Sequence, residues 1–293
     1  VGQRAAQVAG GVPVLAKPPV RKLARDLGVD LTSVLGTGPH GSISRADVEA
    51  AAAPPPRLAE DGVRRVPVRG VRRATAAAMV RSAFTAPHVT EFLTVDVTAT
   101  LELRDRLAAR PDAAGVRLSP LVFTARALLL ALRRTPEMNS SWDDDAGEIV
   151  VFERVHLGIA AATPRGLLVP NVKDAQRLDL LGLARALTAL TEQARSGRTP
   201  PADLTDGTIT ITNVGALGVD TGTPILNPGE AAVLCLGAVR PMPWVHEGQL
   251  AVRQVVQLAV SFDHRVVDGH EASRFLADVG AVLHDPALAL AWC

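Results

Sequence analysis

The spacing of hydrophobic and polar positions changes several times along the chain and predicts alternating strands and helices. Residues 208–212 alternate three threonines with two isoleucines, so the isoleucines are expected to face a core. Apolar β-branched runs predict further buried strands, and apolar residues at helical spacing predict the helices between them. The predicted strands cover residues 88–97, 149–153, 155–162, 208–212, 231–239 and 254–262, and the predicted helices cover residues 71–84, 98–109, 120–134, 178–196 and 269–284.

Shifts in composition divide the chain into four stretches. Residues 1–16 are rich in Ala, Gly and Val and are expected to be the remnant of a linker, and residues 53–65 form a second, Pro/Ala-rich linker. Between the linkers, residues 17–52 predict a small helical unit. Residues 66–293 form one large domain in which helices interleave with strands, which favours an α/β fold around a mixed sheet.

The small unit shows clear start and stop signals for two helices. Pro18 and Pro19 precede a short helical pattern that Gly28 is expected to end. A glycine-rich loop at residues 36–41 follows, and Ser44 is a candidate cap for the second helix. A core this small is marginal, although good helix packing can suffice.

Composition and charge exclude several functional classes. The chain has 31 basic and 30 acidic residues, and aromatic residues make up 3% with no Tyr, so nothing indicates a nucleic-acid partner. No apolar run approaches the roughly 20 residues that span a bilayer, and no secretory signal opens the chain. The two cysteines predict neither a disulfide framework nor a metal site, so a reducing, cytoplasmic setting is expected.

The most informative segment lies at residues 261–269, where His264 stands between a predicted strand and a predicted helix. Asp268 and Glu271 have the spacing of an N-terminal capping box, so the helix is expected to begin there. A histidine held at a buried, fixed position is a candidate general base. The simpler interpretation is a structural histidine followed by a helix cap.

The string Ser-Phe-Asp-His-Arg-Val-Val-Asp-Gly resembles the His-x-x-x-Asp-Gly signature of the dihydrolipoamide acyltransferases, the core of 2-oxo acid dehydrogenase complexes. The related chloramphenicol acetyltransferases and peptide-synthesis condensation domains share the shorter motif, but condensation domains usually carry a second histidine where this chain has Asp263. The resemblance implies a chloramphenicol-acetyltransferase-like mixed-sheet sandwich. It also implies acyl transfer between dihydrolipoamide and coenzyme A.

The acyl group and the class of enzyme remain open at this point. The segment at residues 85–90 and the overall pattern favour a branched-chain acyl group, with acetyl transfer in a pyruvate dehydrogenase complex as the alternative. A free-standing acetyltransferase and a non-catalytic scaffold relative are further alternatives. The presence of His264 argues against the scaffold.

The resemblance also implies roles for particular residues. His264 would be the general base, Thr212 the donor that stabilises the oxyanion, and Asp268 would organise the histidine loop through a charge pair, while Arg265 would be structural. Without the resemblance, Thr212 is simply part of a half-exposed strand. In the family, the histidine and the hydroxyl come from neighbouring subunits of a trimer, and the trimers build a larger symmetric core.

No metal is expected, and coenzyme A is expected as a substrate. The residues that contact coenzyme A are not indicated by the sequence. The lipoyl group would be carried by a domain upstream of Val1, which is not a methionine, so the chain is expected to be part of a longer protein.

The small unit resembles the peripheral-subunit-binding domain of the same acyltransferases, through its loop glycines and both helix patterns. The resemblance implies that Arg21, Lys22 and Arg45 bind acidic surfaces of the decarboxylase or dihydrolipoamide dehydrogenase components. Alternatively, these side chains form an ordinary solvated surface. Ser42 stands where the family commonly has an arginine, which leaves the strength and choice of partner open.

Overall fold

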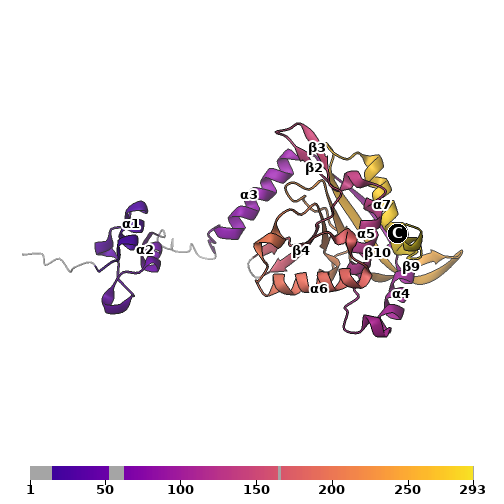
Figure 1. The fold of residues 1–293 in the computed structure, drawn as a ribbon, viewed down its shortest axis with the longest axis horizontal. Coiled ribbons are helices and arrows are strands. Elements are labelled where there is room, and N and C mark those ends of the chain that lie inside the picture. Colours follow the sequence, from indigo (N-terminus) through magenta and orange to yellow (C-terminus); the bar gives the residue numbers. More distant parts are fainter. Residues whose placement is uncertain (1–14, 53–62, 164–165, 293) are drawn as a thin grey trace, which may run out of the picture. The chain divides into compact units, whose positions relative to one another are not determined.

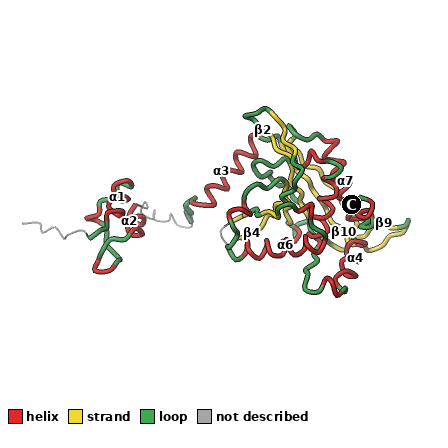
Figure 2. The backbone as a smooth tube through the Cα atoms, viewed as in Figure 1, coloured by secondary structure: helices red, strands yellow, loops and turns green. Residues whose placement is uncertain are grey.

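A computed structural model describes residues 15–52, 63–163 and 166–292. The chain divides into two compact units, Val1–Pro67 and Val68–Cys293, and each is considered by itself. Figure 1 shows the elements of both units, and Figure 2 separates helices, strands and loops by colour.

The described residues 15–52 of the small unit form two helices joined by a loop with two short 3-10 helices. Its elements are α1 (Pro18–Asp26), η1 (Leu31–Ser33), η2 (Pro39–Gly41) and α2 (Arg45–Ala52). Ala24, Ile43 and Val48 form its buried core. The left-handed φ of 65° at Gly28 explains why a glycine follows the first helix.

The start of α2 is fixed by reciprocal hydrogen bonds. The Ser44 hydroxyl accepts from the Asp47 backbone N–H at 3.2 Å, and the Asp47 carboxylate accepts from the Ser44 N–H at 2.8 Å. Asp47 also accepts from the backbone and hydroxyl of Thr37. The hydrogen bonds from Thr37 and Ser44 hold the pKa of Asp47 well below its usual range, and the one from the Thr37 backbone contributes most. The predicted cap at Ser44 is therefore confirmed, and its partner pins the glycine loop to α2.

The large unit is built on one mixed sheet with the strand order β1-β10-β8-β7-β4-β5, in which β6 also pairs with β4 and β9 with β10. β4, β7 and β8 are parallel, and the other pairings are antiparallel. The strands are β1 (His88–Asp96), β4 (Leu157–Thr163), β5 (Gly166–Leu168), β6 (Asn171–Val172), β7 (Ile209–Asn213), β8 (Ala232–Leu236), β9 (Arg240–His246) and β10 (Gln249–Asp263); β2 (Ser140–Asp143) and β3 (Glu148–Val151) form a separate hairpin.

Helices cover one face of this sheet and enclose the main core. The helices that contribute residues to this core are α4 (Thr98–Ala108), α5 (Pro120–Leu132), α6 (Leu180–Arg195), α7 (Gly269–His284) and α8 (Leu288–Ala291), whereas α3 (Gly70–Thr85) contributes none among its described side chains. Alternate residues of β7, including Ile209 and Ile211, join the core with α5, α6 and α7. The threonines between them, such as Thr210, face the other side, as the alternating pattern predicts. The α/β fold class with a mixed sheet is confirmed.

Several strands were not predicted from the sequence. β10 begins at Gln249, five residues earlier than the predicted strand, because its first half pairs with β9 in a hairpin. That hairpin exposes Val245, Leu250 and Val252, so it lacks the continuous buried run on which the prediction relied.

Across the described residues, no helix is both long and apolar enough to cross a membrane.

Candidate active site

His264 lies in a short turn between β10 and α7 whose backbone is tied down at both ends. Its N–H donates to the Pro87 carbonyl at 2.9 Å, and the N–H groups of Val266 and Val267 donate to the Asp263 carbonyl at 3.0 Å. The strand pairing sets His88 of β1 opposite Asp263. The turn is therefore held by the start of β1 as well as by its own strand.

The ring of His88 adds a further tie near this turn. Its Nε2 accepts from the Leu226 N–H at 3.0 Å, so Nδ1 carries the proton and donates to the Ala86 carbonyl at 2.7 Å. The ring thus links the loop at Leu226 to the residues that lead into β1. It acts as a structural connector beside the candidate base.

The side chain of His264 is exposed in the protomer, so the prediction of a buried histidine is wrong at this level. Its ring lies near Phe262, with the ring centroids 5.8 Å apart. The segment leaves the sheet at Asp263, so the His264 side chain lies beyond the end of β10 and is exposed. The hydrogen bonds that fix the backbone of His264 therefore do not bury its side chain.

The charge pair that fixes the turn involves Asp263, not Asp268 as predicted. Arg265 donates to both oxygens of Asp263, with the closest contact at 2.7 Å between Nη2 and Oδ2. The Arg265 guanidinium also lies over the Trp142 ring, 5.0 Å from its centroid. Hydrogen bonding to Asp263 raises the pKa of Arg265, so the guanidinium stays charged. Arg265 has the structural role that the sequence suggested.

Asp268 caps α7, and within the described residues its carboxylate makes no salt bridge with a basic side chain. Its carboxylate accepts from the N–H groups of His270 at 2.8 Å and Glu271 at 3.4 Å. Hydrogen bonding from Glu271, and then from the His270 backbone, lowers the pKa of Asp268. The predicted start of the helix at this position is confirmed, since α7 begins at Gly269.

Thr212 lies near the end of β7, half-buried, on the face of the sheet opposite the main core. The turn that follows packs closely on the end of β8: a Cβ at Gly215 would run into the backbone of Gly237. The Asn213 side chain accepts from the Ala216 N–H at 3.0 Å and closes the turn. The position of Thr212 is therefore fixed by β7 and this tight turn.

Strand register separates Thr212 from His264 within one protomer. Thr212 pairs with Cys235 on β8, which pairs with Ala259 on β10, five residues before His264. Five residues of extended chain span about 16 Å, and two strand spacings add about 10 Å sideways. Taken at right angles, these two offsets place the Cα atoms of Thr212 and His264 roughly 19 Å apart, too far for their side chains to act on one carbonyl carbon. The protomer does not bring them together.

A buried polar cluster near the histidine turn was missed in the sequence. Glu230 is only 9% exposed, and its carboxyl accepts from the Asn227 amide at 3.3 Å. The same amide donates to the Thr210 hydroxyl at 2.9 Å. Burial raises the pKa of Glu230 to about 7, although hydrogen bonds from Thr210 and Asn227 act in the opposite direction. The alternating pattern at residues 208–212 did not indicate that Thr210, its second threonine, lies in a cluster with this buried carboxyl group.

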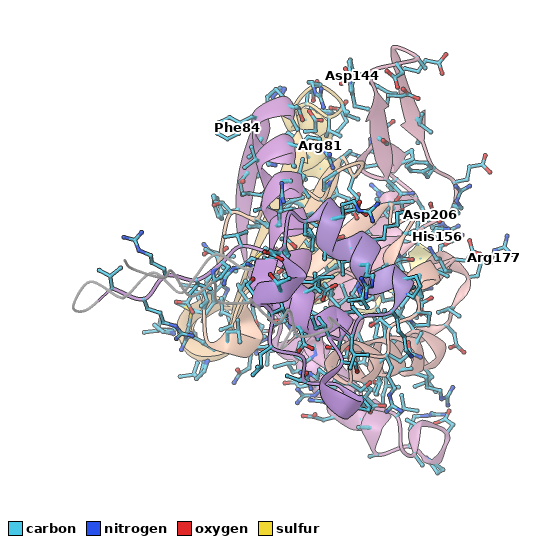
Figure 3. All side chains as sticks on the ribbon, turned by 90° about the vertical axis from the view of Figure 1, so that its left-hand side faces the viewer. Arg81, Phe84, Asp144, His156, Arg177 and Asp206 are labelled. Atoms are coloured by element: carbon cyan, nitrogen blue, oxygen red, sulfur yellow. The ribbon has the colours of Figure 1, made fainter. Side chains whose placement is uncertain are left out.

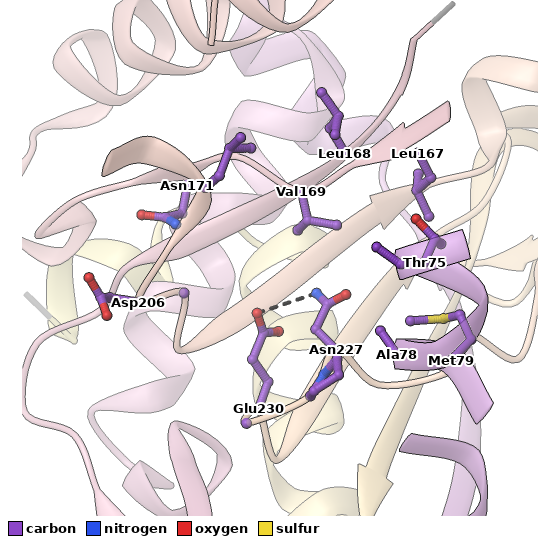
Figure 4. A pocket seen from close by; sticks show the side chains of 15 residues that line it. Thr75, Ala78, Met79, Leu167, Leu168, Val169, Asn171, Asp206, Asn227 and Glu230 are labelled. Carbon is purple, nitrogen blue, oxygen red and sulfur yellow. Dashed lines mark hydrogen bonds between the residues drawn. The ribbon is translucent and has the colours of Figure 1, made fainter. Parts of the chain in front are cut away.

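The cluster lines a cavity of about 610 Å³ whose other walls come from α3 and from residues 167–169 (Figure 4). A second cavity of about 170 Å³ shares Asn227 and Glu230 and reaches Asp263 and Arg265. Arg81 of α3 and Asp144 beyond β2 line this second cavity and are labelled in Figure 3. Both cavities therefore meet at the loop that precedes β8.

Among the residues with described positions, no group of three or more His, Cys, Asp or Glu side chains could hold a metal ion.

The expected candidates for partner binding lie on the small unit. Arg21 donates to the Ala16 carbonyl at 2.9 Å and Arg45 pairs with Glu49 at 2.8 Å, while Lys22 is exposed.

Comparison with protein families matches residues 60–291 to the 2-oxoacid dehydrogenases acyltransferase (catalytic domain) and residues 14–49 to the e3 binding domain. The chain belongs to the 2-oxoacid dehydrogenase acyltransferase family. The family assignment covers both units, and the catalytic match includes Thr212, Glu230 and His264.

The chain is similar to acetyltransferase components of pyruvate dehydrogenase complexes and to acyltransferase components of branched-chain complexes. It is 35% identical to the dihydrolipoyllysine-residue acetyltransferase component of the pyruvate dehydrogenase complex of Bacillus subtilis, over 98% of this chain and 70% of that protein. It is 36% identical to the lipoamide acyltransferase component of the branched-chain alpha-keto acid dehydrogenase complex of Pseudomonas aeruginosa, over 93% of this chain and 66% of that protein. It spans only 56% of the acetyltransferase component of Acholeplasma laidlawii, at 33% identity.

Solved structures confirm the fold of the large unit. A probable dihydrolipoamide acetyltransferase of Listeria monocytogenes matches with a TM-score of 0.72 and 31% identity, covering 76% of this chain and 95% of that one. The dihydrolipoamide acetyltransferase of Azotobacter vinelandii, in which a serine, a histidine and an asparagine were investigated for their catalytic role, matches with a TM-score of 0.75 and 33% identity, covering 81% and 98%. A structure of the cubic core of a pyruvate dehydrogenase complex matches equally well.

Proposed function

We propose that this chain transfers an acyl group between dihydrolipoamide and coenzyme A within a 2-oxo acid dehydrogenase complex. The proposal is supported mainly by the geometry of His264. Hydrogen bonds to Pro87 and from the turn to Asp263 fix its backbone, while its ring is accessible. A thiol has a pKa of about 8.5 in water, so a neutral imidazole can take its proton as it attacks the thioester.

Three positions are proposed for the chemistry. In the A. vinelandii enzyme, the investigated serine precedes the histidine by 52 residues and the asparagine follows it by four. Thr212, His264 and Asp268 have the same spacing in this chain. We assign His264 as general base and the Thr212 hydroxyl as donor to the oxyanion. Asp268 would act by starting α7 at the right residue, because its carboxylate is occupied with the cap.

Atoms and charges balance without a covalent enzyme intermediate. The coenzyme A thiol would lose its proton to His264 Nε2 or Nδ1 and attack the acyl carbon. The tetrahedral oxyanion would accept a hydrogen bond from Thr212, which is the kind of donor worth about 3 kcal/mol in other oxyanion holes. Collapse would expel the dihydrolipoamide thiolate, which would recover the proton from the imidazolium.

The separation of Thr212 from His264 in one protomer supports a site shared between subunits of a homotrimer. Each hydroxyl would then face the histidine of a neighbour, in a head-to-tail contact that three copies close into a ring. Such a contact would also cover the exposed ring of His264. Assembly of trimers into a larger symmetric core is proposed on the same family grounds.

Mixing two inactive subunits tests the shared site. His264→Ala and Thr212→Ala proteins are each expected to be nearly inactive. When the two are co-expressed, a site with both wild-type groups forms wherever a Thr212→Ala subunit supplies the histidine to a His264→Ala neighbour, in about a quarter of sites. Recovery of roughly that fraction of CoA-dependent acyl transfer supports the proposal, and no recovery in confirmed mixed trimers contradicts it.

The acyl group is proposed to be branched-chain, with acetyl as the second candidate. The P. aeruginosa branched-chain relative and the B. subtilis acetyl relative are almost equally similar, which favours neither. Rates of reverse transfer from acetyl-CoA, isobutyryl-CoA and isovaleryl-CoA to dihydrolipoamide decide between them. A kcat/KM for acetyl-CoA well above both branched substrates would contradict the branched-chain assignment.

The small unit is proposed to hold a peripheral enzyme of the complex through Arg21, Lys22 and Arg45. The decarboxylase and the dihydrolipoamide dehydrogenase are the two proposed partners. The lipoyl group is proposed to reach the site on a lipoyl domain that is not part of this chain. A cytoplasmic location remains a proposal as well.

A further inference from the structure

Two backbone hydrogen bonds hold the turn at His264 between other segments of the chain. The His264 N–H donates to the Pro87 carbonyl, and the neighbouring Asp263 N–H donates to the Ala231 carbonyl, each at 2.9 Å. Ala231 ends the segment of residues 226–231, called the 226–231 loop, which leads into β8. The position of the histidine turn therefore depends on how firmly this loop is held.

The other end of the loop is tied to β1 by the ring of His88. The Leu226 N–H donates to its Nε2 at 3.0 Å, and its Nδ1 donates to the Ala86 carbonyl at 2.7 Å. Since Pro87 lies next to His88, the ring completes a closed circuit of hydrogen bonds through the loop and the histidine turn. Of the three links between segments in this circuit, only the ring can change its protonation near neutral pH.

Leu226 is buried, so its N–H needs the acceptor that His88 supplies. Its side chain is 1% exposed and packs with Ala86 and Val233, and its carbonyl accepts from the Ser82 hydroxyl at 2.7 Å. A buried N–H without an acceptor is costly. Protonation of His88 puts a hydrogen on Nε2, which can then no longer accept, and brings a positive charge against the Leu226 N–H. The bond is therefore made by the neutral ring and lost with the charged one.

We propose that His88 is a positioning residue: its neutral ring holds the 226–231 loop, and with it the turn at His264, and protonation of the ring releases both. This role rests on the proposed function, because the turn carries the proposed base. The loop also supplies Asn227 and Glu230 to the lining of both cavities, as Figure 4 shows for the larger one. Release is therefore expected to lower acyl transfer although His88 does not touch the reacting atoms.

Other charged groups surround Leu226 and act on the same equilibrium. The cavity that Leu226 lines also contains Arg81 of α3, Asp144 between β2 and β3, Glu230 of the loop, and the paired Asp263 and Arg265, with His264 between them in sequence. Glu230 acts with the opposite sign, because burial raises its pKa to about 7, so that acid neutralises it and favours the packed loop. A loop that loosens in acid therefore has the sign expected of a histidine.

Hydrogen exchange of the 226–231 loop, followed by mass spectrometry, tests the tie without turnover. After correction for the intrinsic effect of pH on exchange, protection of the Leu226 amide should fall about tenfold from pH 8 to pH 5. His88→Gln offers an amide oxygen in place of Nε2 and has no ring to protonate, so it should keep the protection at both pH values. His264→Ala and His246→Gln leave the His88 ring in place and should show the same fall as the unmodified protein.

Transfer kinetics test the consequence for the reaction. His88→Leu removes the acceptor and should lower kcat/KM at pH 8 by at least about tenfold, whereas His88→Gln should stay within about threefold of the unmodified protein. Below pH 6.5, log kcat/KM should fall less steeply in His88→Gln than in the unmodified protein, because one of two required neutral rings has been replaced.

Unchanged protection of Leu226 between pH 8 and pH 5 in the unmodified protein overturns the proposal, and so does an equal fall in His88→Gln. Both comparisons stand even where His88→Leu fails to fold. Equal slopes of the acid limb in His88→Gln and the unmodified protein also overturn it. Absence of acyl transfer in the unmodified protein would refute the proposed function, yet hydrogen exchange would still decide whether the ring holds the loop.

Discussion

Single residues at the candidate site combine a fixed backbone with different surroundings. His264 keeps an exposed ring on a turn held by Pro87, whereas Glu230 is buried with one unpartnered oxygen. Thr212 lies between these extremes, half-buried on a strand. The chemistry proposed for each residue follows from these surroundings, because burial sets how strongly a hydrogen bond or a charge acts.

Two substitutions at Thr212 test the contribution of its hydroxyl to catalysis separately from that of its methyl group. Thr212→Ser should keep kcat within a few-fold, because the donor remains. Thr212→Val keeps the shape and should lower kcat by about 10²–10³-fold, as for other oxyanion donors. Steady-state kinetics with dihydrolipoamide and acyl-CoA measure this. Equal activity of the serine and valine variants would remove Thr212 from the mechanism.

Glu230 should make stability depend on pH. Its pKa is raised to about 7 in the fold from an ordinary 4.5, so between these values the folded state binds more protons than the unfolded state. The free energy of unfolding therefore falls as pH rises from 4.5 to 7, by about 3 kcal/mol from this group.

Glu230→Gln cannot ionise and should lack this loss. Urea unfolding at pH 5 and pH 8 should show the variant gaining relative to the unmodified protein at the higher pH. The same relative stability at both values would show that Glu230 does not titrate in this range. Glu148→Gln, at an exposed position, is the matched control.

The end of β10 and the start of α7 fix the position of the histidine turn. β10 ends at Asp263, so His264 is the first residue beyond the strand, and α7 begins five residues after His264. The Asp263–Arg265 pair closes the turn between them, and the Asp268 cap sets the first residue of the helix. A shift in either end would move the histidine relative to Pro87.

Two substitutions at Asp268 distinguish a cap from a charge. Asn is a good N-cap residue, so Asp268→Asn should keep the melting temperature and most of the activity. Asp268→Ala removes the acceptor for two backbone N–H groups and should lower both. Thermal unfolding and transfer rates measure the two effects. A large loss of activity in Asp268→Asn without loss of stability would indicate an electrostatic role instead.

At the scale of the whole molecule, the proposed site would be completed by a second copy of the chain. In one protomer the sheet register holds the Cα atoms of Thr212 and His264 roughly 19 Å apart, so the two proposed groups would have to come from different copies. The hairpin of β9 and β10 exposes Val245, Leu250 and Val252, and Phe84 at the end of α3 is 86% exposed. Apolar surface of this kind is typical of proteins that associate.

Dilution should therefore lower the specific activity. If the site is shared, activity per subunit falls once the concentration drops below the range in which trimers persist. Light scattering gives the mass, and transfer assays on the same samples give the activity, so the two should decline together. Full specific activity in a sample shown to be monomeric would contradict a shared site.

The sequence by itself determined the parts that depend on near neighbours. The helix starts at Ser44 and Asp268, the alternation of residues 208–212 and the strand ending at the histidine were all predicted, because caps and periodicity act over a few residues. The family resemblance at residues 261–269 also came from a local string.

Only the tertiary structure decided which of these groups meet. The exposure of His264, the pairing of Asp263 with Arg265, and the distance from Thr212 depend on strand order and register. The burial of Glu230 beside Thr210 depends on a loop packed across the sheet, which no short pattern encodes. Contacts between residues far apart in sequence arise from packing of whole elements, so local spacing could not specify them.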